Sequence, residues 1–163
     1  MTDNARSKRS RSKPDLGLLD GLVQLSFAVH GALERVAEQH ELSLVQVRLL
    51  GILRDREPGM LELAKYLGLD KSSVTGLVTR AERRGLVQRS GTEEDRRAVH
   101  VALTVQGREL AQIFAKQVER ELAALVSDLS EADQKRLSAL ASAVVIGEAE
   151  RRMPGVSVFP RKP

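Results

Sequence analysis

The stretch LELAKYLGLDKSSVTGLVTRAERRGLV (61–87) contains the pattern that decides the fold. LELAKYLG predicts a short helix that Gly68 closes, because glycine readily adopts the left-handed conformation that ends helices. Asp70 is a suitable N-cap for a second helix, which Gly85 ends. LVQR (86–89) is short and extended. The pattern predicts two helices joined by a tight turn and followed by a strand.

Two further helices precede this stretch. Apolar residues recur at helical spacing from 16 to about 40, which predicts a long helix with a broad apolar face. Ser43 and Gln46 have the spacing of a capping box, which opens a helix that runs to about Arg54. The Glu-Pro-Gly sequence at 57–59 then breaks the chain.

A second strand follows. Val99, Val101 and Leu103 alternate along one face of VHVAL (99–103), which predicts a strand that pairs with 86–89 in a hairpin with a long polar connection.

Two long helices complete the chain. Thr104 caps a helix that runs to about Ser127, and Ser130 with Asp133 forms a second cap, which opens a helix to about Arg152.

This order of elements defines the expected fold class, which is mainly α with a small β-hairpin wing. Residues 43–103 have the layout of a winged helix-turn-helix core. The long helical regions 15–42 and 104–152 flank it and are richly apolar. The basic tail 1–14 is expected to be disordered, and 153–163 forms a C-terminal tail.

Composition excludes several classes of function. The 163 residues include 42% hydrophobic and 29% charged residues, which is ordinary for a globular protein. The absence of cysteine excludes disulfides, thiol redox sensing and Cys-ligated zinc. Aromatic residues make up only 2%, which disfavours stacking on single-stranded nucleic acid. No apolar run approaches the roughly 20 residues of a membrane span. We expect a soluble, cytoplasmic protein with no membrane partner, no metal and no cofactor.

Charge is distributed unevenly along the chain, although the net charge is only +4. Residues 71–101 carry a net charge of +3, whereas 15–70 carry −4 and 102–150 carry −3. The tail 1–14 carries +4. A basic centre between acidic flanks favours a polyanionic partner. The N-terminal tail either adds nonspecific phosphate contacts or serves only as a solubilising leader.

The helix after Asp70 has one face suited to DNA. Val74, Leu77, Val78 and Ala81 form a buried stripe. The opposite face carries short hydroxyl side chains, a glycine and basic residues, and an ordinary solvated face would carry more Glu and Lys. Hydroxyl groups bond base edges or phosphates in the major groove and arginine reads guanine. The residues predicted to contact DNA are Lys71, Ser72, Ser73, Thr75, Gly76, Thr79 and Arg80.

The acids Glu93, Glu94 and Asp95 at the expected hairpin tip do not indicate catalysis. Adjacent carboxylates there would be solvated and splayed, and no His, Ser or metal-ligand pattern accompanies them. No catalytic residue is therefore assigned. An arginine at a wing tip can instead enter the minor groove, where the negative potential is strongest. Asp95 is placed to accept hydrogen bonds from Arg97 and hold it in position.

The region from ELAKYLGLDKSS to VHVALTVQG resembles the DNA-binding core of the MarR (multiple antibiotic resistance regulator) family. Three motifs carry the resemblance: ELA-x-x-L-x-L-[DS]-x-S, the R-x-G-[LW]-[VI] turn, and D-x-R-x-x-x-V-x-L-T-x-x-G. With the flanking helices it covers roughly 16–150.

The resemblance implies a cytoplasmic DNA-binding transcriptional regulator and not an enzyme. It implies a homodimer in which 15–42 and 104–152 interlock, with two winged domains gripping double-stranded DNA. Arg97 falls on the family's minor-groove arginine, Asp95 on its orienting partner and Arg96 on a phosphate contact. Recognition helices about 34–36 Å apart imply inverted half-sites about 10 bp apart in a pseudo-palindromic operator.

Family members commonly release DNA when a small aromatic or phenolic anion binds between the dimer helices and the winged domain. Phe27, His30, Gly31 and Arg48 are candidate lining residues on this resemblance. The alternatives are that His30 is a half-buried structural histidine and that Arg48 is an intramolecular salt-bridge partner. Two functions stay open: a ligand-responsive repressor, and a ligand-independent activator or architectural protein.

Overall fold

The computed structural model of the protein describes residues 14–91 and 99–152. Its elements follow the predicted order of four helices, a hairpin and two helices. Their bounds are α1 Gly17–Gln39, α2 Leu44–Arg54, α3 Met60–Leu67, α4 Lys71–Arg83, β1 Val87–Ser90, β2 His100–Leu103, α5 Val105–Leu125 and α6 Glu131–Arg152. The prediction of a mainly α fold with a small hairpin wing is confirmed.

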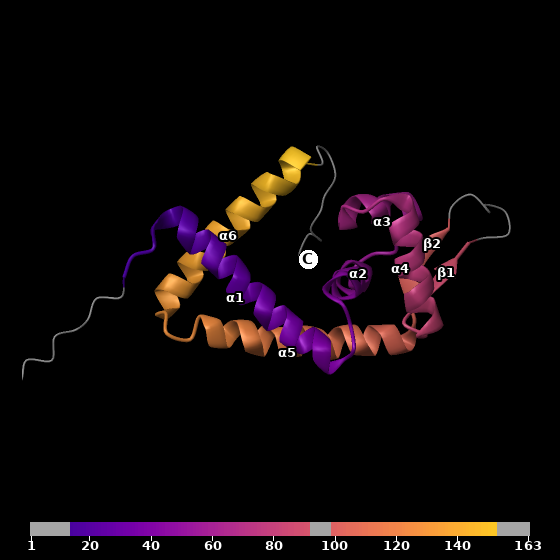
Figure 1. Cartoon of the computed structure of the whole chain (residues 1–163), viewed down its shortest axis with the longest axis horizontal. Helices are drawn as coiled ribbons and strands as arrows, with labels where there is room; N and C mark the ends of the chain where they lie inside the picture. The colour runs from indigo at the N-terminus through magenta and orange to yellow at the C-terminus, as the bar shows by residue number, and fades with distance from the viewer. Residues whose placement is uncertain (1–13, 92–98, 153–163) are drawn as a thin grey trace, which may run out of the picture.

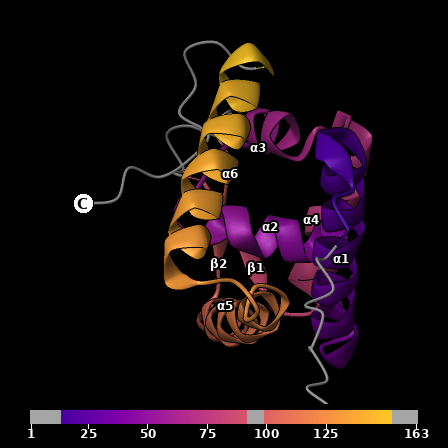
Figure 2. The ribbon, with the colours of Figure 1, turned by 90° about the vertical axis from the view of Figure 1, so that its left-hand side faces the viewer.

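The molecule has two ends. Helices α2, α3 and α4 and the hairpin gather at one end, and the long helices α1, α5 and α6 extend to the other (Figure 1). The helices α1 and α6 cross in projection in that view but stand apart on either side of the molecule when it is turned (Figure 2). Within the chain, α1 packs against α5.

Side chains placed at the helix ends account for several element boundaries. Ser43 and Gln46 form the predicted capping box at the start of α2. The side chain of Asp70 accepts from Ser73 N at the start of α4, and Gly68 ends α3 in the left-handed region with φ of 68°. Thr104 caps α5 by accepting from Gly107 N. Each of these caps satisfies backbone groups that the helix itself cannot pair.

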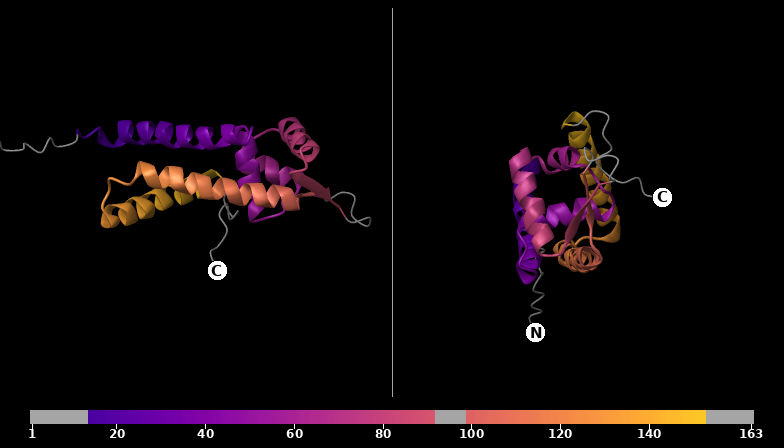
Figure 3. Two further views of the ribbon diagram at one scale, coloured as in Figure 1. Left: turned by 90° about the horizontal axis from the view of Figure 1, so that it is seen from below. Right: turned by 90° about the vertical axis from the view of Figure 1, so that its right-hand side faces the viewer.

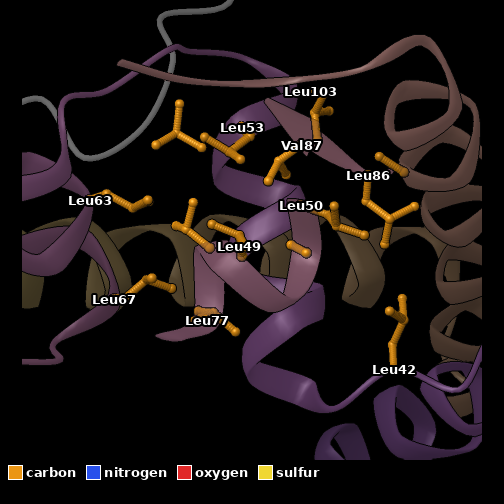
Figure 4. Packing of buried hydrophobic residues seen from close by; sticks show 14 of the residues in the cluster. Leu42, Leu49, Leu50, Leu53, Leu63, Leu67, Leu77, Leu86, Val87 and Leu103 are labelled. Carbon is orange, nitrogen blue, oxygen red and sulfur yellow. The ribbon is translucent and has the colours of Figure 1, made fainter. Parts of the chain in front are cut away.

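The hydrophobic core lies around α2. Leu49, Leu50 and Leu53 of α2 are buried, and in Figure 4 they lie between Leu63 of α3 and Leu103 of β2. Burying one leucine side chain contributes about 1.5–3 kcal/mol. The core therefore fixes α4 and the hairpin to one rigid unit.

The hairpin is a two-stranded antiparallel sheet that pairs Val87 with Leu103 and Ser90 with His100. The predicted one-sided alternation of the second strand is only partly correct. Val101 and Leu103 are buried and Val99 half-buried, but Ala102 on the other face is buried too. The reason is that β2 packs against both α2 and α5.

The Glu-Pro-Gly segment also pairs with β2 through an isolated bridge. Val101 N donates to Pro58 O at 3.0 Å, and Gly59 forms a bridge with His100. The sequence predicted only an interruption there, because a pairing between residues about forty positions apart leaves no local signal.

A tight joint connects the hairpin to α5. Thr104 donates from its backbone N to Leu86 O at 3.1 Å and from its hydroxyl to Gly85 O at 2.6 Å. Gly107 lies so close to this strand that an added Cβ would be 1.8 Å from Leu86 O. Only glycine fits at this contact, which we call the α5 joint (Gly85, Leu86, Thr104 and Gly107).

Candidate nucleic-acid interface

Helix α4 presents the predicted polar face to the outside. Its stripe of Val74, Leu77, Val78 and Ala81 is buried in the core, as the sequence indicated. The opposite face is mostly exposed. Among the residues predicted to contact DNA, the exposed ones are Lys71, Ser72, Ser73, Thr75 and Arg80, and the half-buried ones are Gly76 and Thr79.

The first turn of α4 is organised by Asp70. Its carboxylate accepts hydrogen bonds from the Ser72 hydroxyl, the Ser73 hydroxyl at 2.6 Å and Ser73 N at 2.9 Å. The Ser72 bond, followed by those from Ser73, holds the pKa of Asp70 well below its usual range. Thr75 donates its hydroxyl to Lys71 O at 2.8 Å. The hydroxyl groups of this turn therefore have defined orientations before any partner binds.

The wing residues Asp95, Arg96 and Arg97 lie outside the residues that the structure describes. The strands that lead to them project from the end of the molecule opposite the α5–α6 turn (Figure 3). The hairpin therefore projects beyond α4 at this end of the molecule (Figure 1).

Sequence reasoning missed Arg89 of β1. Its Nη1 lies 2.9 Å from Glu82 Oε2, and its Nη2 donates to Thr79 Oγ1 at 3.2 Å. The alternation of the strand offered a signal, since Arg89 lies on the same face of β1 as the buried Val87. The arginine therefore joins β1 to α4.

The four residues predicted to line a ligand site do not gather around one cavity in this chain. Phe27 is 65% exposed, and Gly31 is half-buried. His30 is exposed with its Nε2 3.3 Å from Glu34 Oε1, so its interpretation as a half-buried residue does not hold in the single chain. The apolar neighbours of His30 in α1 are only partly covered within the chain, because Phe27 and Ala28 are exposed and Val29 and Leu33 are half-buried.

Arg48 has a different role from the predicted salt bridge. Its guanidinium donates to Tyr66 O at 2.9 Å and to Leu67 O at 3.3 Å. These carbonyls belong to the last turn of α3, where unpaired oxygens and the helix dipole attract a cation. Arg48 therefore fastens α3 to α2.

A cavity of about 330 Å³ lies between α2 and α5. Its lining is largely apolar, with Arg54 and Glu119 as its charged members, and Arg54 also pairs with Asp55 at 2.8 Å. The predicted lining residues Phe27, His30, Gly31 and Arg48 are not part of it. The lining residues are Val47, Leu50, Gly51, Arg54, Ala111, Phe114, Ala115, Val118 and Glu119. A sequence pattern identifies a buried face but does not show where packing leaves a void.

The described residues show neither a metal site nor a membrane-spanning helix. Between 14 and 91 and between 99 and 152, no group of three or more His, Asp or Glu residues could hold a metal ion. Among the same residues, no helix is both long and apolar enough to cross a membrane.

Comparisons with known proteins agree with this geometry. A model of the MarR family matches residues 40–98. The HTH-type transcriptional regulator PecS of Dickeya dadantii is 30% identical over 153 residues, covering 86% of this chain and 87% of PecS. The homoprotocatechuate degradative operon repressor of Escherichia coli is 32% identical over 100 residues, covering 60% of this chain and 67% of the repressor.

A solved structure shares the fold. The crystal structure of NadR in complex with 4-hydroxyphenylacetate matches with a TM-score of 0.63 at 24% identity, covering 82% of this chain and 95% of NadR.

Proposed function

The chain belongs to the MarR family of winged helix-turn-helix transcriptional regulators, and on this premise we propose that it is a homodimeric repressor of a pseudo-palindromic operator, released by a small aromatic or phenolic ligand. In this proposal α4 enters the major groove and the wing reaches the minor groove. Domain roles follow: 43–103 binds DNA, and 15–42 and 104–152 form the dimer.

The observation that carries the DNA-binding role is the outer face of α4. Its buried stripe fixes the helix in the core, while Ser72, Ser73, Thr75 and Arg80 remain exposed on the opposite side. The N-terminal half of a recognition helix commonly contacts base edges, and basic side chains neutralise phosphate. Arg97 and Arg96 are proposed as the minor-groove and phosphate contacts of the wing, with Asp95 orienting Arg97.

Exposed apolar side chains on the long helices support a homodimer. Helix α6 has no buried residue among those described, although Leu140 and Val144 are large and about 60% exposed. On α1, Leu18, Leu19 and Phe27 are exposed as well. A helix without tertiary packing is marginally stable in water. A second copy of the chain would cover both helices and supply that packing.

The cavity between α2 and α5 supports a ligand-responsive regulator. Its volume of about 330 Å³ is in the range of small-molecule sites, which start at about 300 Å³. Phe114 offers an aromatic wall, and Arg54 offers a cation for a carboxylate or phenolate. The solved relative NadR holds 4-hydroxyphenylacetate in the same fold. This cavity is the proposed effector site.

The central test is a selection of bound duplexes from a random pool, followed by release experiments with aromatic acids. We expect enrichment of an inverted repeat with half-sites about 10 bp apart. Arg97→Ala should weaken specific binding by about 1–3 kcal/mol without changing the dimer. Absence of any enriched sequence would contradict the repressor proposal, and unchanged affinity of the Arg97 variant would contradict the wing assignment.

The effector site is tested separately by filling the cavity. Ala115→Leu should abolish release by an active aromatic acid and leave operator affinity unchanged. Lys116→Ala, an exposed neighbour on α5, is the control and should keep release intact. Release that persists in the Ala115 variant would place the ligand elsewhere. If no aromatic acid releases the wild-type protein, a ligand-independent activator or architectural protein becomes the better account.

A further inference from the structure

Arg89, Glu82 and Thr79 form a cluster that we call the clamp. Arg89 comes from β1, where it pairs with Val101, and Glu82 and Thr79 come from α4. The guanidinium contacts both at once, with Nη1 2.9 Å from Glu82 Oε2 and Nη2 3.2 Å from Thr79 Oγ1. One side chain thus joins β1, the strand that leads to the wing residues, to α4, which carries the predicted major-groove contacts.

The charges of the clamp fit a structural rather than a phosphate-binding role. Glu82 is the single acid of α4, and a free carboxylate there would repel the DNA backbone. Its side chain is 27% exposed and that of Arg89 33%, so solvent screens this pair less than a fully exposed pair. Because the pair has no net charge, it adds little attraction for phosphate.

The clamp also sets the hydrogen-bond polarity of Thr79. A hydroxyl group has one proton and two lone pairs. Thr79 Oγ1 accepts from Arg89, so its proton stays available for an acceptor outside the protein. In the major groove such acceptors are guanine O6 and N7, adenine N7 and thymine O4.

We propose that Arg89 is a positioning residue: with Glu82 it holds the wing strand against the recognition helix in the geometry needed to read DNA, and it does not itself bind phosphate. This inference rests on the proposed function, in which α4 and the wing read adjacent grooves. Clamp and phosphate contact predict opposite effects of removing Glu82. If Arg89 contacted phosphate, loss of the acid would free it and strengthen binding.

The DNA test uses Glu82→Gln, Arg89→Gln and the double variant, with Arg120→Gln on α5 as a control for charge. We expect each single variant to lower the ratio of operator to random-duplex affinity by roughly threefold to thirtyfold, and the double variant to be no worse than either. The salt dependence of Arg89→Gln should match that of Arg120→Gln. The inference is overturned if Glu82→Gln raises this affinity ratio or leaves it unchanged. It is also overturned if Arg89→Gln, but not Arg120→Gln, lowers the slope of log affinity against log salt concentration by about 0.9, the value for one phosphate contact.

A second measurement tests the clamp without DNA. The chain contains no cysteine, so Ser90→Cys on β1 and Lys65→Cys on α3 accept spin labels without background labelling. In labelled protein diluted with unlabelled chain, the distance distribution should broaden or shift when Glu82 or Arg89 is replaced by Gln. An unchanged distribution overturns the inference. If the wild-type protein prefers no duplex, the proposed function fails while this measurement still decides whether the clamp exists.

Discussion

The α5 joint offers the sharpest stability prediction, Gly107→Ala. The added Cβ would lie 1.8 Å from Leu86 O, 2.8 Å from Leu86 C and 3.2 Å from Leu86 Cα. All three atoms belong to the backbone, so no side chain can rotate away. To reach 3.0 Å, the shortest distance that real Cβ atoms keep, α5 and the strand must separate by at least 1.2 Å.

Three hydrogen bonds depend on this contact. They are Thr104 N to Leu86 O at 3.1 Å, the Thr104 hydroxyl to Gly85 O at 2.6 Å, and Gly107 N to Thr104 Oγ1 at 3.0 Å. Loss of each hydrogen bond lowers the stability by about 1 kcal/mol, and overpacking lowers it by about 1–3 kcal/mol. The higher helix propensity of alanine raises it by about 1 kcal/mol. The free energy of unfolding should therefore fall by about 3–5 kcal/mol.

Urea denaturation at a fixed protomer concentration measures this loss, since a dimer's stability depends on concentration. A corresponding fall in the melting temperature is about 6–20 °C. Gly51→Ala is the matched control, because Gly51 lies in α2 and its added Cβ meets no atom within 4 Å. It should stabilise the protein by about 1 kcal/mol. If the free energy of unfolding of Gly107→Ala lies within about 1 kcal/mol of the wild-type value, the contact between α5 and Leu86 is looser than the structure indicates.

Three further changes test other features. The hydrogen bonds from Ser72 and Ser73 lower the pKa of Asp70, so the wild type should be more stable than Asp70→Asn. This advantage should be full above the ordinary Asp pKa of about 3.9 and be lost as the pH falls toward the lower pKa of the folded state. Melting curves from pH 7 to 2 check this, and a difference in stability that stays constant over that range contradicts it. Val144→Asp on the exposed face of α6 should yield monomers in sedimentation velocity, and an intact dimer would show that α6 lies outside the interface. Arg48→Met removes the hydrogen bonds to the α3 carbonyls, so the free energy of unfolding measured in urea should fall by about 1 kcal/mol while release of DNA by the ligand is kept. Loss of release without loss of stability would instead show that Arg48 binds the ligand anion.

Local signals in the sequence predicted the elements well. The cap residues Ser43, Asp70 and Thr104 act within their own helices, so their spacing alone locates the helix starts. The buried stripe of α4 follows from helical periodicity and is confirmed. The predictions that were wrong concern the contacts and burial of side chains, which depend on segments distant in the chain.

Arg48 and His30 illustrate those failures. The partners of Arg48 are carbonyls some 18 residues away, and backbone acceptors carry no sequence signature. The apolar neighbours of His30 suggested burial, but within the single chain Phe27 and Ala28 are exposed and Val29 and Leu33 only half-buried. The wing residues Asp95 to Arg97 remain predictions, as do all the DNA contacts. Arg89 shows that a charged residue on the same strand face as a buried residue can indicate a contact between two elements.

Helix α5 runs without interruption for 21 residues, Val105–Leu125, and passes the joint at Gly107 and the cavity wall at Phe114. It is therefore a continuous helix about 30 Å long. A tilt of α5 by about 5° about the joint would displace the Leu125 end of the helix by roughly 2.6 Å. Because Gly107 lets α5 lie directly against Leu86, a change in the direction of α5 would also act on the hairpin.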